Sequence, residues 1–389
     1  MLAKAVRQLS TAQGVARMSG SGVPPGILAR DLYAGSAGAV LALAELVAEF
    51  EDPEHRAILA AGARGLTPPP PEGQCLSGLH MGEAGVGAAL LRAGQVLRDV
   101  SLIAAAIEQA RVVTTLPHAM PDVIYGTAGR LTFHLLLWDA TGDPAQLHHA
   151  VTAGEALLAS GEDPGGGGLR WTIPPGYQGL SGHAYTGYAH GAAGIADALL
   201  DLYHATRDER FLIAAQRAGQ WLARLAVPTL DDGTGLDRPR VEDGELPGAF
   251  WCHGSAGVGR FFLHATERGI LPKADRIAAR AARAAARGAR WANPTRCHGL
   301  AGSIDFLLDM FQATGEPAYL AETWSLARLL EAFVTDENGM RWSAASTGGS
   351  ASGYMVGNAG IALCFLRLSD PERRPSQLSR RGFRHGTRV

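Results

Sequence analysis

The sequence lacks several features that would assign it to a class of protein at once. No apolar stretch approaches the roughly 18 residues of a membrane span, and the N-terminal residues contain no apolar core of a signal peptide. An excess of one charge is also missing, since 35 Lys and Arg against 37 Asp and Glu leave a net charge of −2. Such a balance offers no basic surface for nucleic acid or anionic membranes. These absences predict a cytoplasmic protein with no membrane span and no nucleic-acid partner.

Cysteine is scarce, and the common signatures of nucleotide and nucleophile sites are absent. The four cysteines are Cys75, Cys252, Cys297 and Cys364. In a large cytosolic chain they are expected to be thiols or metal ligands rather than a disulfide framework. No Walker loop, Rossmann fingerprint or nucleophile elbow accompanies the glycines. With 47% apolar and 19% charged residues over 389 positions, the chain is globular and can bury a sizeable core.

Glycine, by contrast, is abundant, with 50 residues arranged in a recurring pattern. A Gly-x-x-Gly pair followed by an apolar run occurs seven times, with its first glycine at Gly35, Gly82, Gly126, Gly191, Gly254, Gly299 and Gly357. By subtraction, successive first glycines are 44 to 65 residues apart, which leaves room for two helices and their turns. The pattern therefore predicts seven helical repeats.

The helices of each repeat are expected to differ in polarity. Segments that follow the glycine pairs are apolar on nearly all sides, as inner helices are, and small residues three apart would let helices approach closely. Amphipathic outer helices are predicted at 53–66, 143–160, 208–226 and 274–292. The first and last motifs are as apolar as the others, unlike the polar caps of an open solenoid. We therefore predict an all-α fold, an α/α toroid (barrel) of seven inner/outer helix pairs.

Domain boundaries follow from the extent of the repeats. We place the barrel at 29–369, preceded by a flexible N-terminal segment at 1–28. Residues 370–389 are arginine-rich and lack apolar periodicity, which predicts a flexible tail. Glycine-rich loops at 162–171 and 231–248 would roof one mouth of the barrel.

Residues just before the glycine pairs should meet near the N-termini of the inner helices. Repeats four to six place His190, Cys252, His253, Cys297 and His298 there. Two sulfurs and an imidazole from Cys252, Cys297 and His298 suit Zn²⁺ and leave a fourth position open. An open position indicates a catalytic metal rather than a structural one.

Three neighbours of this set are candidates for catalysis. His190 occupies the same slot one repeat earlier and could be a fourth ligand, an acid or base, or a core histidine; we favour acid–base work. His253 follows a proposed ligand and could contact substrate or a carboxylate behind the ligands. Asp122, four residues before Gly126, could orient a histidine or cap the inner helix.

The remaining cysteines and histidines are weaker candidates. Structural roles are predicted for Cys75, Cys364 and His134, and solvated positions on an outer helix for His148 and His149. Minor candidates for the site are His80, His118 and His183.

The glycine pairs, together with PDVIYGTAG, AHGAAG, WCHGSAGVG and RCHGLAG, resemble the lanthionine synthetase C-like (LanC-like) family from about residue 33 to about residue 366. The resemblance implies an α/α toroid that catalyses Michael-type addition of peptide cysteine thiols to dehydroalanine or dehydrobutyrine, forming lanthionine or methyllanthionine thioether rings. It implies Zn²⁺ on Cys252, Cys297 and His298, with His190 as acid or base and Asp122 orienting it. The implied partner is a dehydrated precursor peptide with its leader.

The chain departs from part of this pattern. The nisin-type branch of the family has an arginine four positions before the first zinc cysteine and a tyrosine directly after it, where this chain has Gly248 and His253. We therefore expect His253 to take part of the arginine's role in stabilising the enolate. The form WCHGSAGVGRFFL is similar to the cyclase modules of kinase-lyase-cyclase synthetases. Dehydration is thus expected from separate dehydratase or kinase/lyase enzymes, or from other modules of a larger enzyme.

Two other functions stay open at this point. One is a non-catalytic LanC-like scaffold that binds peptides or thiols, against which the retention of three zinc ligands argues. The other is a zinc-dependent peptide-thiol prenyltransferase, which would need a basic diphosphate pocket, and no Lys/Arg cluster accompanies the motifs. Cyclisation of a dehydrated peptide separates the cyclase from the scaffold, and incorporation of a labelled prenyl group would favour the transferase.

Overall fold

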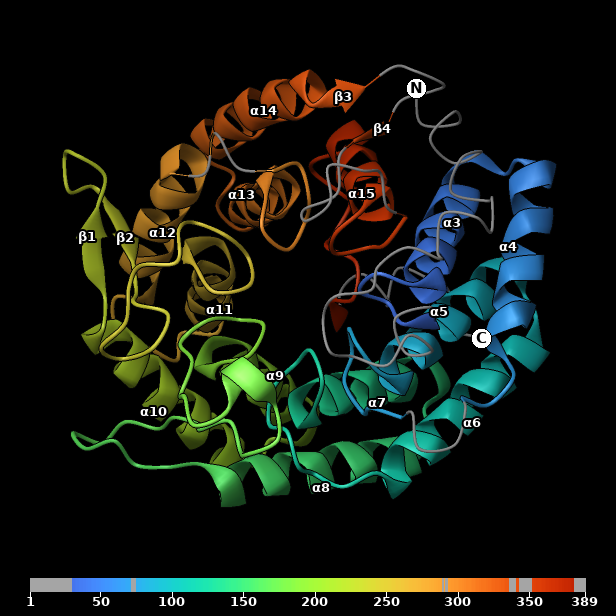
Figure 1. Cartoon of the computed structure of the whole chain (residues 1–389), viewed down its shortest axis with the longest axis horizontal. Coiled ribbons are helices and arrows are strands. Elements are labelled where there is room, and N and C mark those ends of the chain that lie inside the picture. The colour runs from blue at the N-terminus through green and yellow to red at the C-terminus, as the bar shows by residue number, and fades with distance from the viewer. Residues whose placement is uncertain are drawn as a thin grey trace.

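The computed structural model of the protein describes residues 30–70, 75–288, 290, 293–335, 341–342 and 352–380. Over these residues the chain forms a closed ring in which inner helices are surrounded by outer ones (Figure 1). This architecture confirms the predicted all-α toroid. The expected N-terminal segment, 1–28, lies outside the described residues.

Inner and outer helices alternate along the chain. The inner helices are α3 (Ser36–Phe50), α5 (Glu83–Leu97), α7 (Thr127–Thr141), α9 (Ala192–Thr206), α11 (Ser255–Glu267), α13 (Leu300–Thr314) and α15 (Asn358–Ser369). The outer helices are α4 (Pro53–Leu66), α6 (Val100–Thr115), α8 (Pro144–Ser160), α10 (Glu209–Arg224), α12 (Ala274–Gly288) and α14 (Pro317–Ala332). Each inner helix packs against the next, and α15 packs against α3, which closes the ring.

Short elements occupy the connections. Strand β1 (Val227–Thr229) pairs with β2 (Gly235–Asp237), and β3 (Val334–Thr335) pairs with β4 (Arg341–Trp342). Both pairs are antiparallel. A single 3₁₀ turn, η2 (Gln178–Leu180), lies in the connection before α9. None of the helices in the described part of the chain is both long and apolar enough to cross a bilayer.

Outer and inner helices begin in different ways. Four outer helices start at an aspartate whose side chain accepts a backbone N–H of the first turn: Asp52, Asp99, Asp143 and Asp208. Every inner helix starts at a glycine that has no side chain to do this. At α5, α7, α9 and α13 the preceding loop folds back and one of its carbonyls accepts instead, as from Thr127 N–H to Met120 O at 2.7 Å. These four glycine motifs are therefore loop-capped helix starts.

The second glycine of each pair is required by space. A Cβ on Gly129 would lie 2.2 Å from Val123 O and 2.3 Å from Leu79 N, both of them backbone atoms. In all seven pairs, a Cβ on the second glycine would lie too close to the carbonyl oxygen of the residue six positions earlier. From the sequence these glycines are expected to let helices approach closely, but the structure shows that they make room for the loops.

We call the residues just before the seven glycine pairs the motif loops. Backbone hydrogen bonds join one motif loop to the next around the barrel, and we call this circuit the loop ring. In each bond the backbone N–H of the first residue donates to the backbone carbonyl oxygen of the second. The bonds are Tyr33 to His80 (2.8 Å), Met81 to Ile124 (2.9 Å), Ala189 to Cys252 (2.9 Å), Cys252 to Cys297 (3.3 Å), Cys297 to Met355 (2.8 Å) and Met355 to Tyr33 (2.9 Å). Of the seven steps in this described circuit, only that from the third loop to the fourth lacks a backbone bond.

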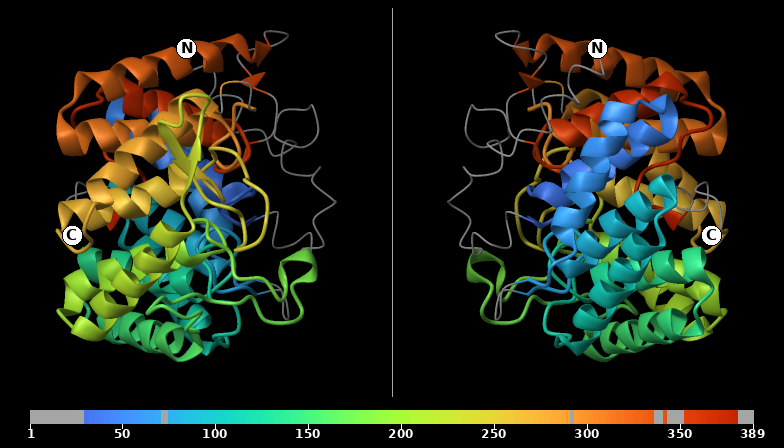
Figure 2. Two further views of the ribbon diagram at one scale, coloured as in Figure 1. Left: turned by 90° about the vertical axis from the view of Figure 1, so that its left-hand side faces the viewer. Right: turned by 90° about the vertical axis from the view of Figure 1, so that its right-hand side faces the viewer.

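The two long connections, before α9 and before α11, extend from one face of the ring (Figure 2). They are joined by hydrogen bonds from Thr186 N–H to Arg240 O at 3.1 Å and from Thr186 Oγ1 to Pro239 O at 2.7 Å. We call this side the loop face. The glycine-rich loop at 162–171 differs from the prediction that it covers the mouth, because Arg217 and Arg224 of the outer helix α10 donate to its carbonyls.

The C-terminal residues correct one expectation. Residues 370–389 are predicted as a solvated, flexible tail, but Ser376 and Gln377 are buried. Arg380 is also buried, paired with Asp139 at 2.6 Å, and Arg260 donates to Ser376 at 3.1 Å. Ion pairs with the barrel therefore bury a segment that has no apolar periodicity. Residues 381–389 lie outside the described part.

Substitution of a second motif glycine should destabilise the fold. Gly129→Ala forces two backbone segments apart, so we expect the free energy of unfolding to fall by about 2 kcal/mol or more. Gly65→Ala, in α4, meets nothing within 4 Å and should leave stability unchanged or raise it by up to about 1 kcal/mol. Urea unfolding of both variants checks this, and equal effects at the two positions would contradict it.

Candidate metal and catalytic site

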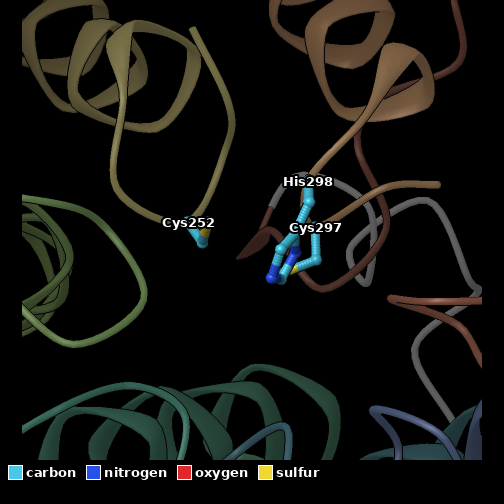
Figure 3. A group of neighbouring side chains, drawn as sticks. All are labelled: Cys252, Cys297 and His298. Atoms are coloured by element: carbon cyan, nitrogen blue, oxygen red, sulfur yellow. The ribbon is translucent and has the colours of Figure 1, made fainter. Parts of the chain in front are cut away.

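Three proposed ligands come together inside the loop face. Cys252 comes from the loop before α11, whereas Cys297 and His298 come from the loop before α13 (Figure 3). Their sulfur and imidazole ligand atoms all lie within 4.8 Å of one another. Ligands bound to one zinc at about 2.0–2.3 Å have separations of this order. The repeat phase thus identified a group of side chains that is close in space.

The chemistry of this group fits a metal ion. Both sulfurs are buried and neither is in a disulfide. Burial raises the pKa of Cys297 well above its ordinary value, while the hydrogen bond from Cys297 lowers the pKa of Cys252. Burial also lowers the pKa of His298, which favours the neutral imidazole that metals bind. His298 Nδ1 is buried and has no hydrogen-bond partner among the described residues. Two sulfurs and a neutral imidazole are a donor set suited to Zn²⁺.

Neighbouring residues anchor the ligand loops. Arg296, directly before Cys297, lies 4.5 Å from the centroid of the Tyr354 ring and forms an ion pair with Asp305 on α13. Trp251, directly before Cys252, is buried against the core. These anchors restrict the motion of both sulfurs, because each loop is held by a large side chain next to its cysteine.

Asp122 and His190 form a hydrogen-bonded pair beside the ligands. Asp122 Oδ2 lies 2.5 Å from His190 Nδ1, and the carboxylate is fully buried. Asp122 Oδ1 accepts the Tyr125 N–H at 2.8 Å, while Gly126 is the N-cap of α7. Asp122 was expected either to orient a histidine or to cap the inner helix, and its contact with His190 agrees with the first of these roles. The carboxylate accepts from Nδ1, which leaves His190 Nε2 as the nitrogen that can exchange a proton.

His253 lies beside this pair. Its ring centroid is 5.6 Å from that of His190 and 5.5 Å from that of Tyr185. Burial, helped by the charges of His190 and Arg240, lowers the pKa of His253 to about 3. His253 Nδ1 is buried and has no partner among the described residues. His253 is thus a neutral side chain close to the proposed catalytic histidine.

Arg240 is a site residue that the sequence analysis missed. It lies in the connection between β2 and α11, exposed at the loop face, with its guanidinium carbon 5.3 Å from the centroid of the Tyr185 ring. Its charge acts on Cys252, His253 and His298, lowering the pKa of each. Arg240 therefore supplies a positive charge at the site, although Gly248 stands where the nisin-type branch has its arginine. The sequence offers no signal for Arg240, because it has no fixed spacing from a Gly-x-x-Gly motif. Its position near the ligands depends on how the long connection folds.

Two residues of the first motif loop were also missed. The Tyr33 hydroxyl donates to Cys297 Sγ at 3.1 Å. Asp31 Oδ1 accepts the N–H groups of Ala34 (2.8 Å) and Gly35 (2.9 Å), while Oδ2 is buried and has no partner among the described residues. Asp31 precedes Gly35 by four residues, the spacing of Asp122 from Gly126, and this signal could have identified it.

The other candidates lie away from the ligands or in the core. His134 is buried and bonded to Gln146 at 2.9 Å, as predicted, and Cys364 is buried within α15. His148 is exposed and His149 half-buried on α8. His118 and His183 are exposed, whereas His80 is buried on the inner wall with its pKa lowered to about 3 by burial.

The interior beneath the loop ring is nearly filled. A cavity of about 70 Å³ there is lined by charged side chains, among them Asp197, Arg260 and Asp305, and by residues 376–379 of the C-terminal segment. Such a volume holds a few water molecules but no peptide. The loop face is therefore the side from which a large substrate can reach the sulfurs.

Burial of Asp31 should make stability depend on pH. Its pKa is raised to about 7 by burial, against about 3.9 in an unfolded chain, so the folded state binds more protons between these values. The free energy of unfolding should therefore fall as pH rises through this window. Asp31→Asn cannot ionise and keeps an acceptor for Ala34 and Gly35. Relative to wild type, it should gain about 2–3 kcal/mol between pH 5 and pH 8 in urea unfolding. The same difference at both pH values would argue against a buried, neutral Asp31.

Comparison with known proteins places this fold and site in context. The family model described as lanthionine synthetase C-like protein matches residues 26–378. Among solved structures, nisin cyclase aligns with a TM-score of 0.69 and 16% identity, over 99% of this chain and 97% of its own. At that identity the likeness shows the fold.

Two other solved structures align with lower scores. A D-mannose isomerase aligns with a TM-score of 0.49 and 12% identity, over 82% of this chain and 99% of its own. A GH76 α-mannanase from Bacteroides thetaiotaomicron aligns with a TM-score of 0.49 and 14% identity, over 96% of both chains. No curated protein matches the sequence. Because the family match covers most of the chain, this protein belongs to the lanthionine synthetase C-like family.

Proposed function

We propose that the chain is a zinc-dependent lanthipeptide cyclase that adds peptide cysteine thiols to dehydroalanine or dehydrobutyrine, forming lanthionine or methyllanthionine rings. The observation that carries this proposal is the convergence of Cys252, Cys297 and His298 within 4.8 Å of one another. Membership of the lanthionine synthetase C-like family supports the reaction class. The substrate would be a dehydrated precursor peptide with its leader, supplied in the cytoplasm by separate dehydratase or kinase/lyase enzymes.

The three ligands would hold Zn²⁺ and leave its fourth position open. Zinc bound there would lower the pKa of a peptide thiol and present the sulfur as a nucleophile. Cys252 and Cys297 are 5% and 2% exposed, so their sulfurs have little access to solvent. Exclusion of water at this place strengthens electrostatic interactions and keeps competing nucleophiles away from the alkene.

His190 would move the proton. In the addition, the sulfur bonds to the β-carbon, the π electrons of the alkene move to the carbonyl oxygen, and the α-carbon takes up a proton. His190 Nε2 would accept the thiol proton and return it to the α-carbon, so that protons balance over the reaction. Asp122, bonded to Nδ1 at 2.5 Å, would fix the ring orientation and stabilise the imidazolium formed between the two transfers.

Arg240 and His253 would stabilise the negative charge that develops on the carbonyl oxygen. Arg240 supplies a permanent positive charge near the ligands, where the motif position Gly248 has none. The ring centroid of His253 is 5.6 Å from that of His190, and its neutral imidazole would donate a hydrogen bond to the carbonyl oxygen. His253 was expected from the sequence to take part of this role, and the proposal assigns the remainder to Arg240.

Zinc content is the first test of the metal assignment. We expect about one zinc per chain by elemental mass spectrometry, lost in Cys297→Ala because one of three protein ligands is removed. Cys75→Ala, which removes a half-buried cysteine outside the ligand group, should keep its zinc. Ring formation adds no mass, so it is measured as the loss of maleimide-reactive thiols from a dehydrated peptide. Peptide binding without loss of thiols would favour the scaffold, and incorporation of a labelled prenyl group would favour the transferase.

Loss of His190 should separate proton transfer from metal binding. His190→Asn is expected to lower kcat/KM for cyclisation by about 10²–10⁴-fold, the usual worth of a general acid or base, while zinc content stays unchanged. Asp122→Asn should give a smaller loss, because it affects only the orientation and charge of the histidine. The matched control is His148→Asn, at an exposed position of α8. Cyclisation by His190→Asn at the wild-type rate would remove His190 from the mechanism.

A further inference from the structure

One hydrogen bond at the site links parts of the chain that are far apart in sequence. Tyr33 lies in the first motif loop and Cys297 in the sixth, 264 positions further on, yet the Tyr33 hydroxyl donates to Cys297 Sγ at 3.1 Å. The tyrosine hydroxyl is a donor and the sulfur an acceptor, so the bond adds positive character next to the thiolate. Neither the repeat phase nor the acid–base pair accounts for this contact.

The backbone of Tyr33 is held on both sides. Its N–H donates to His80 O at 2.8 Å, and its carbonyl accepts the Met355 N–H at 2.9 Å, where the last repeat meets the first. A Cβ on Gly353 would lie 2.7 Å from Tyr33 O, so the two loops are in close contact at this seam. Closure of the barrel thus places the tyrosine ring before any ligand is present.

The two sulfurs have different surroundings. Cys297 Sγ accepts the Tyr33 hydroxyl at 3.1 Å, whereas the neighbouring Cys297 side chain and the backbone at His253 lower the pKa of Cys252. Two thiolates cannot donate to each other, because neither sulfur carries a proton. The Tyr33 hydroxyl is then the donor that this structure provides for Cys297 Sγ.

We propose that Tyr33 is a positioning residue which, through its hydrogen bond to Cys297 Sγ, limits the charge that this sulfur donates to the metal. The proposal rests on the metal site described above. A hydrogen bond to a thiolate lowers the energy of the sulfur lone pair and leaves the metal more electron-poor. A thiol at the open position then ionises at lower pH, which keeps more of the peptide thiol reactive near neutrality.

Cobalt substitution tests the bond without any peptide. We expect the full-length chain to bind Co²⁺ with sulfur-to-cobalt charge-transfer absorption. In Tyr33→Phe, which removes only the hydroxyl, that absorption should move to longer wavelength, and Co²⁺ affinity should fall by about 10-fold or more. Tyr203→Phe makes the same change at the far end of α9 and should alter neither quantity. With zinc, the acid limb of the cyclisation pH profile should move to higher pH in Tyr33→Phe.

The outcomes distinguish this proposal from the proposed function. Wild type without thiolate–cobalt absorption would overturn the metal site and the role of Tyr33 together. Wild-type absorption that is unchanged in Tyr33→Phe would overturn only the role of Tyr33. If the Phe variant does not fold, site-specific 3-fluorotyrosine at position 33 decides, because its more acidic hydroxyl strengthens the bond. The absorption should then move to shorter wavelength, and an unmoved band would overturn the proposal.

Discussion

The loop ring is the constraint on which the rest of this structure depends. Each motif loop donates backbone hydrogen bonds to the next, from Tyr33 to His80 and onward until Met355 returns to Tyr33. The second glycine of every pair lies against a carbonyl oxygen of its own motif loop, which leaves no room for a Cβ. Inner helices begin directly on these loops, so the ring also sets where each helix starts. The third and fourth motif loops are not joined by a backbone bond. There the hydrogen bond between the Asp122 and His190 side chains joins the two loops, so the pair that would transfer protons also completes the loop ring.

The candidate site follows from this arrangement. Cys252 and Cys297 lie in consecutive loops whose backbones are bonded at 3.3 Å, so their sulfurs meet without any helix having to bend. Closure between the last and first repeats then delivers the Tyr33 hydroxyl to Cys297. A site carried by loops would ordinarily be mobile, but here each loop is bonded to its neighbours and to the helix that it caps. Such a scaffold holds ligands in place before metal or substrate binds.

Paired charges fill the opposite half of the barrel. Arg367 is fully buried and bonds Asp305 at 3.0 Å and Asp309 at 2.7 Å, joining α15 to α13. The C-terminal segment adds Arg380, paired with Asp139 of α7. Removal of one member of such a pair leaves an uncompensated buried charge, which is strongly unfavourable. In the described part of the chain, these contacts place buried ion pairs and residues 376–380 at the end of the barrel away from the loop face.

The sequence by itself determined the repeat phase, the alternation of inner and outer helices and the proposed ligand group. The helix predicted at 53–66 is α4 with the same bounds, because helical periodicity depends on near neighbours. The Cys252, Cys297 and His298 group could be predicted because repeats place equivalent residues in equivalent positions. Only the tertiary structure decided that Arg240 and Tyr33 reach the ligands and that residues 370–380 are buried. Those contacts join residues that no periodicity relates, and they exist only once the ring has closed and the long loops have settled over its mouth.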